Sequence, residues 1–197
     1  AASKITDTEN TERATGQETF KSNQGTDVQF IDACVSDTTA NKSYTLTGTV
    51  ATSPETIEGG HVFTTLTCDS PDCTCDENIE IVAFEPTKRF RDIIRRLQKG
   101  DTVTVYGEIT DDTLKLEKLR VTELKTTTKT NPYCDDCDKS MSSMGANQGY
   151  RCSSCRNTQP EKVTVPLHRE LVSGRMYEVP PTARRHLTKP LIRKLTT

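Results

Sequence analysis

Apolar and polar residues alternate in five segments of the chain, and this period of two predicts β-strands. The segments are residues 44–51, 61–67, 78–84, 102–109 and 113–124. The first places Tyr44, Leu46 and Val50 on one face. The last changes parity between Leu116 and Leu119, which predicts a bulge or a sharp bend within that strand.

One helix is expected between the third and fourth strands, over residues 87–97. Its apolar residues recur at i, i+3, i+4 and i+7, at Phe90, Ile93, Ile94 and Leu97. Thr87 can cap its start and Gly100 can end it. Three strands, a helix and two strands follow the order of a five-stranded OB-fold barrel. We therefore expect a mainly β protein built on such a barrel.

Four cysteines after the barrel form two C-x-x-C pairs, Cys134 with Cys137 and Cys152 with Cys155. Fourteen residues separate the pairs, a spacing typical of a tetrahedral zinc site with four thiolates. Few apolar residues lie between them, so metal binding must supply the folding free energy. The alternative, two structural disulfides, requires an oxidising compartment. Four thiolates fill the coordination sphere, which predicts a structural zinc ribbon.

The other four cysteines lack this paired spacing. Cys68, Cys73 and Cys75 lie close together after the second strand, and Cys34 lies upstream. A second metal site and a group of unrelated loop thiols are both open interpretations.

Residues 156–197 differ in charge from the rest of the chain. They hold nine basic and three acidic side chains, while the whole chain has a formal net charge of −2. Leu187, Leu191 and Leu195 recur every four residues, which predicts a helical arm that Pro190 would kink or divide. The arm either docks on the barrel through its leucines or contacts the phosphates of a nucleic acid.

Three groups of side chains are candidate nucleic-acid contacts. Tyr150 and Arg151, just before Cys152, can stack on and pair with exposed nucleotides. The helix and the arm contribute cations, namely Lys88, Arg89, Arg95, Arg96, Arg184, Arg185, Lys189 and Arg193. Aromatic residues make up only 5% of the chain, which argues against generic single-strand binding through stacking platforms.

Sequence motifs of catalysis and of membrane insertion are missing. No phosphate-binding glycine loop, nucleophile elbow or pair of catalytic carboxylates is recognisable, so we expect no catalysis by this chain alone. No apolar run is long enough to span a membrane, and residues 1–10 lack the apolar core of a signal peptide. The sequence predicts a soluble, cytoplasmic protein. The polar start without Met is typical of a piece of a longer protein.

Several longer motifs occur in a fixed order. They are IEGGHVF at residues 57–63, AFEPTKRFR at 83–91, GDTVTVYG at 100–107, LKLEKL at 114–119, NPYCDDC at 131–137, QGYRCSSC at 148–155 and PPTARRHLTKPL at 180–191. These resemble the OB domain, zinc ribbon and terminal arm of the archaeal tRNA(Ile) agmatinylcytidine synthetases. The NQGTD segment, with Asn23, Gln24, Thr26 and Asp27, resembles the end of that family's ferredoxin-like, substrate-binding region.

The resemblance implies a role in tRNA modification. Such ligases use ATP to join agmatine to C2 of the wobble cytidine in the isoleucine tRNA with a CAU anticodon, which then reads AUA. The parts of the family that bind ATP and agmatine precede the matching segments. The resemblance therefore implies that this chain holds the tRNA. A different interpretation is a stand-alone, non-enzymatic OB-fold and zinc-ribbon module that binds nucleic acid.

We expect four regions. Residues 1–43 form a lead-in and the end of an upstream ferredoxin-like domain, and residues 44–130 form the OB-fold domain. Residues 131–160 form the zinc ribbon, and residues 161–197 form the basic arm.

Overall fold

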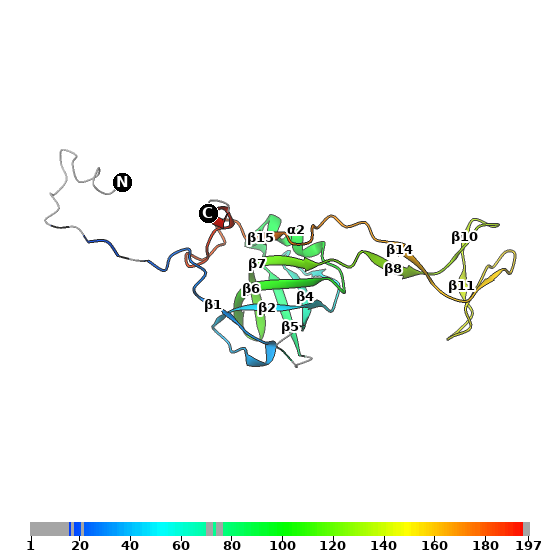
Figure 1. The fold of residues 1–197 in the computed structure, drawn as a ribbon, viewed down its shortest axis with the longest axis horizontal. Helices are drawn as coiled ribbons and strands as arrows, with labels where there is room; N and C mark the ends of the chain where they lie inside the picture. The colour runs from blue at the N-terminus through cyan, green and yellow to red at the C-terminus, as the bar shows by residue number, and fades with distance from the viewer. Residues whose placement is uncertain (1–15, 17, 21, 70–72, 74–76, 195–197) are drawn as a thin grey trace.

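Five strands close a barrel at the centre of the molecule (Figure 1). The computed structural model describes residues 16, 18–20, 22–69, 73 and 77–194. The barrel strands are β2 (Ser43–Val50), β4 (Val62–Cys68), β5 (Asn78–Ala83), β6 (Thr102–Thr110) and β7 (Thr113–Glu123). They pair in the order β2-β6-β7-β5-β4, and β4 pairs with β2 to complete the circle. Only the β5–β7 pair is parallel within this circle. The expected OB-fold barrel is confirmed.

The strands bury the side chains that the alternation predicted. Leu46, Val50, Leu114 and Leu119 are at most 1% exposed. The parity change in the last strand is a β-bulge, because the register with β6 shifts at Glu117. The bulge keeps apolar residues on the inner face before and after it. It also gives β7 two successive buried charged residues, Glu117 and Lys118.

The helix is shorter than expected and begins differently. A 3-10 turn, η2 (Glu85–Thr87), precedes α2 (Arg89–Arg95), which buries Phe90 and Ile94. Lys88, with a φ of 49°, separates the two elements. Thr87 does not cap α2, because its hydroxyl donates to the Phe84 carbonyl at 2.7 Å. Pro86 starts the tighter turn and thereby takes Thr87 away from the helix start.

Short strands extend the sheet at its edges. β1 (Phe30–Asp32) lies parallel to β2, β3 (Glu55–Thr56) pairs with β4, and β15 (Met176–Glu178) pairs with β7. A 3-10 turn, η1 (Val35–Asp37), connects β1 to β2.

The C-terminal residues 161–194 are mostly extended. They form β14 (Val163–Pro166), β15 and the short 3-10 helix η3 (Leu191–Lys194). Helical structure in this described segment is thus limited to η3, because its backbone pairs with β7 and with residues 25–27 instead. Leu195, the last leucine of the predicted repeat, lies outside the described residues. Within the described parts of the chain, no helix is long and apolar enough to cross a membrane.

A buried ion pair fastens this C-terminal segment to the barrel. Arg169 donates to both carboxylate oxygens of Asp101, at 2.6 and 2.5 Å, and the two side chains are 6% and 0% exposed. The same carboxylate accepts backbone N–H bonds from Gln98 at 2.8 Å and Lys125 at 3.0 Å. Asp101 therefore joins the end of the helix region, the start of β6 and the residues that lead to the ribbon.

We expect Asp101→Ala to lower the free energy of unfolding of the barrel by about 3–5 kcal/mol, because it leaves a buried guanidinium without its carboxylate. Urea denaturation followed by circular dichroism measures the loss. The control is Asp92→Ala, which removes the exposed ion pair with Arg95 and is expected to cost less than about 1 kcal/mol. Equal losses in the two variants would contradict the role assigned to Asp101.

Candidate metal centre and nucleic-acid interface

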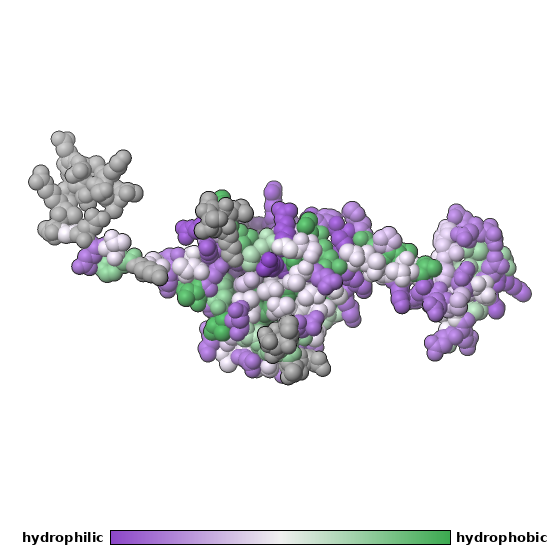
Figure 2. All heavy atoms as spheres, in the orientation of Figure 1, coloured by the Kyte–Doolittle hydropathy of each residue, from purple (hydrophilic) through white to green (hydrophobic). Residues whose placement is uncertain are grey.

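The four paired cysteines lie in a small module at the end of a two-stranded stalk (Figure 1). The stalk pairs β8 (Thr127–Thr130) with β14. The module contains β9 (Tyr133–Cys134) with β10 (Lys139–Ser140), and β12 (Tyr150–Arg151) between β11 (Ser142–Ser143) and β13 (Thr158–Gln159). Its surface is largely hydrophilic (Figure 2). The two cysteine pairs thus lie in neighbouring small sheets.

The two pairs form the same kind of turn. The Asp138 N–H donates to the Cys134 carbonyl at 2.9 Å, and the Arg156 N–H donates to the Cys152 carbonyl at 3.1 Å. Asp138 and Arg156 each follow the second cysteine of their pair and have φ values of 54° and 66°. This left-handed residue folds the chain back, so that both sulfurs of a pair face the same point.

All four sulfurs, of Cys134, Cys137, Cys152 and Cys155, lie within 4.8 Å of one another. The buried cluster of the module contains only Cys134, Cys152 and Met141, with Tyr150 packed against it. A core of this size cannot order about thirty residues by apolar burial alone. Four thiolates around one point fit a tetrahedral zinc ion, which supplies the missing folding free energy.

The backbone prepares one sulfur for this role. N–H groups of Cys155 and Ser154 lower the pKa of the Cys152 thiol to about 6. The opposite shift occurs at Cys137, where the hydrogen bond to Cys155, together with burial, raises the pKa to about 12. One sulfur of the cluster therefore ionises readily while another holds its proton. Zinc replaces such protons because it binds the thiolate form.

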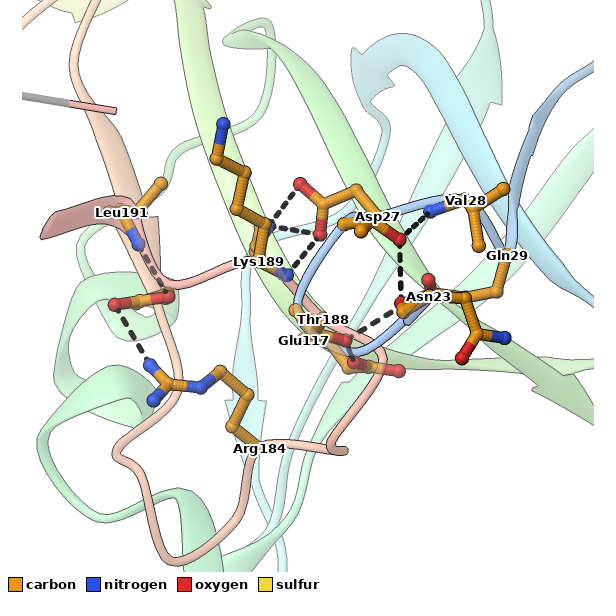
Figure 3. A network of polar contacts seen from close by, with 12 residues as sticks. Asn23, Asp27, Val28, Gln29, Glu117, Arg184, Thr188, Lys189 and Leu191 are labelled. Carbon is orange, nitrogen blue, oxygen red and sulfur yellow. Dashed lines mark hydrogen bonds and ion pairs between the residues drawn. The ribbon is translucent and has the colours of Figure 1, made fainter. Parts of the chain in front are cut away.

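A second polar arrangement connects both ends of the described chain to β7 (Figure 3). Lys118, which is fully buried, donates to both carboxylate oxygens of Asp27 at 2.6 Å. The Asp27 carboxylate also accepts the backbone N–H of Lys189 at 2.6 Å. Gly25 and Thr26 donate their N–H groups to the carbonyls of residues 186 and 187. The NQGTD segment and the arm therefore hold each other against the barrel.

Arginines of the arm take part in this arrangement. Arg184 pairs with Glu178 at 3.2 Å. Arg185 pairs with Glu117 and, at 3.1 Å, with Glu108. Two of the predicted phosphate contacts are thus committed to carboxylates of the same chain, as in the docking interpretation of the arm.

The remaining predicted cations lie at separate places. On the helix, Lys88 pairs with Glu85, Arg95 with Asp92 and Arg96 with Glu170, while Arg89 is exposed. In the arm, Lys189 contacts Asp27 through its backbone, and its amine points away from that carboxylate (Figure 3). Arg193 is exposed and lines a cavity of about 330 Å³ with Gln24, Arg184 and Arg185.

A groove beside the metal centre contains residues that sequence reasoning missed. Its volume is about 350 Å³, and Tyr150 lines it together with Lys129, Lys162 and one acid, Glu161. Lys129 lies on β8 and Lys162 just before β14, so pairing of the two strands brings these distant lysines to one end of the stalk. Both are exposed. The Thr/Lys-rich sequence of residues 125–131 looks like a linker, and only the strand pairing indicates the groove.

Known proteins with this arrangement come from one group. The model of the TiaS C-terminal zinc ribbon domain matches residues 131–171. The 2-agmatinylcytidine synthetase TiaS of Haloquadratum walsbyi, which is named for an isoleucine tRNA, is 42% identical over 95% of this chain. That of Archaeoglobus fulgidus is 45% identical over 88% of the chain. This chain is a homologue of the TiaS proteins. It spans 47% and 40% of the length of these two relatives.

Solved TiaS structures agree in fold. The crystal structure of TiaS with its isoleucine tRNA and ATP superposes with a TM-score of 0.68 at 43% identity, over 87% of this chain and 39% of the other. The complex of TiaS with the same tRNA, AMPCPP and agmatine gives a TM-score of 0.66 at 40% identity, over 87% and 38%. The cysteine cluster lies within the match to the TiaS zinc ribbon, and its metal is a structural zinc.

We expect Cys152→Ser to remove one zinc per chain and to unfold residues 131–160, because the module has almost no apolar core. Metal analysis and hydrogen exchange measure the two effects, and the barrel is expected to keep its protection. Ser153→Ala, at the exposed neighbouring position, is the control and is expected to keep its zinc. Since protons compete for the thiolates, lowering the pH is expected to release the metal. An ordered ribbon in the zinc-free variant would contradict this account.

Asp27→Ala is expected to destabilise the docked arm by about 3 kcal/mol, since it removes the carboxylate that the buried Lys118 contacts. Limited proteolysis of residues 180–194 then becomes faster. Lys189→Ala is the matched control, because only its backbone N–H contacts Asp27 and the bond remains. Unchanged proteolysis of the Asp27→Ala protein would show that the arm docks without this ion pair.

Proposed function

We propose that this chain is the tRNA-binding, C-terminal part of an ATP-dependent ligase that attaches agmatine to the wobble cytidine of the CAU-anticodon isoleucine tRNA. The observation that carries the proposal is the continuous match to TiaS across barrel, ribbon and arm. A relative with this fold has been solved in complex with an isoleucine tRNA and ATP. A stand-alone module of another kind would have no reason to retain all three parts in this order.

The geometry supports tRNA binding by the ribbon. A rigid, metal-ordered module at the end of a stalk reaches away from the barrel (Figure 1) and can approach a folded nucleic acid. The groove beside it offers Tyr150 for stacking on a base and two exposed lysines, Lys129 and Lys162, for phosphates. Arg151 adds an exposed cation next to Tyr150. The barrel contributes a second surface through Arg89.

The chain's share in the reaction is to hold the tRNA. ATP and agmatine would be bound by the parts of the ligase that match the remaining length of its relatives. In this proposal, residues 1–43 end an upstream domain, and residues 44–130, 131–160 and 161–197 are the barrel, ribbon and arm. We place the protein in the cytoplasm, where tRNA is modified and used.

Lys129→Ala with Lys162→Ala is expected to weaken tRNA binding and to flatten its salt dependence. Removing one phosphate contact lowers the slope of log affinity against log salt by about 0.7 for a single strand and about 0.9 for a duplex, so two contacts correspond to about 1.4–1.8. Tyr150→Ala is expected to cost about 1–3 kcal/mol with little change in slope. A salt titration of tRNA binding measures both effects.

Two further variants make this titration decisive. Lys42→Ala with Lys99→Ala removes the same charge from exposed positions outside the groove and is expected to leave the slope nearly unchanged. Arg184→Ala with Arg185→Ala removes cations that are paired with carboxylates and is expected to change the slope less than the groove variant. Binding that depends on the arm and not on the groove would move the interface to the arm.

The chain alone, given ATP, agmatine and tRNA, is expected to bind the tRNA without forming agmatinylcytidine. Nucleoside analysis of the recovered tRNA measures the product, and a complete relative such as that of Archaeoglobus fulgidus is the positive control. Product made by the chain alone would overturn the assignment of its role as tRNA binding only.

A further inference from the structure

Three cysteines outside the ribbon also converge on one point. Cys34 precedes η1, Cys68 ends β4, and Cys73 lies in the connection from β4 to β5. Their sulfurs all lie within 4.8 Å of one another. Cys34 and Cys73 are paired as a disulfide with a Cα–Cα distance of 5.7 Å, and the Cys68 sulfur lies 2.9 Å from that of Cys73.

Two of the three sulfurs are fixed by the barrel itself. Cys68 pairs with Gly48 of β2, and its N–H donates to the Glu77 carbonyl at 3.0 Å. Cys34 directly precedes the buried Val35. Cys68 is 7% exposed and belongs to the main core, and Cys34 and Cys73 pack against that core. The cluster is therefore a built feature of the barrel end.

We propose that Cys34, Cys68 and Cys73 bind a zinc ion as three thiolates. A disulfide uses two sulfurs and gives the third no reason to lie among them, whereas a metal uses all three. Tetrahedral zinc with Zn–S bonds of about 2.3 Å separates its sulfurs by about 3.8 Å, which is compatible with the spread of this cluster. Thiolates are also the ligands that favour zinc over magnesium or calcium.

The ribbon of the same chain supports the reduced state of these cysteines. Its zinc requires Cys134, Cys137, Cys152 and Cys155 as thiolates. An environment that keeps those four reduced disfavours a disulfide elsewhere in the chain. The same conditions that load the ribbon therefore leave the three cysteines of the barrel available for a metal.

The site would fasten the segment before β2 to the connection after β4. Three protein ligands leave one tetrahedral position for water or another donor. Cys75 lies outside the described residues and is not part of the proposed site. The role that follows is structural, because the cluster closes one end of the barrel core beside Val35. The proposal does not depend on tRNA binding.

Metal analysis of protein purified anaerobically tests the site. We expect two zinc ions per wild-type chain and one in the ribbon variant Cys137→Ser with Cys155→Ser. Adding Cys68→Ser to that variant is expected to remove the remaining ion. Val35→Ala, which trims the core beside Cys34 without removing a sulfur, is the control for destabilisation and is expected to keep both ions.

A second measurement does not rely on the stability of the Cys68 variant. The folded ribbon variant, stripped of zinc and titrated with Co²⁺, is expected to show sulfur-to-cobalt charge-transfer absorption that saturates at one ion per chain. Alkylation after chelation, without reductant, is expected to label Cys34, Cys68 and Cys73. One zinc in the wild type and none in the ribbon variant would overturn the proposal, as would a Cys34–Cys73 pair that is alkylated only after reduction.

Discussion

The contact between Lys118 and Asp27 determines how the ends of this chain lie on its barrel. A fully buried ammonium group has a high desolvation cost, and the Asp27 carboxylate compensates it with both oxygens at 2.6 Å. Lys118 points away from the barrel core because the bulge at Glu117 shifts the parity of β7. The NQGTD segment and the arm must then cover it, and their backbones bond to each other in doing so.

Barrel and ribbon are stabilised by different physical means. The barrel buries a continuous apolar core and one bidentate ion pair, Asp101 with Arg169. The ribbon buries two cysteines and Met141, so the bonds from thiolates to zinc replace apolar burial as its source of folding free energy. This difference allows a small, polar module to remain rigid at the end of a stalk, where an apolar core of ordinary size has no room.

Charge alone is a poor guide to the nucleic-acid interface of this protein. The arm has the most basic sequence, yet its arginines Arg184 and Arg185 are held by carboxylates of β6, β7 and β15. Lysines in an apparent linker, Lys129 and Lys162, instead meet beside Tyr150. Interface residues are therefore better sought among exposed cations that the fold brings next to an aromatic side chain.

The sequence determined the elements whose signals are local. Alternation predicted the five strands, the parity change between Leu116 and Leu119 predicted the bulge, and the spacing of the two C-x-x-C pairs predicted the metal centre. The tertiary structure alone decided which distant groups meet. Asp27 lies 91 residues from Lys118, and Cys34 lies far from Cys68 in sequence. Such contacts depend on the closure of the barrel and leave no periodic trace in either partner segment.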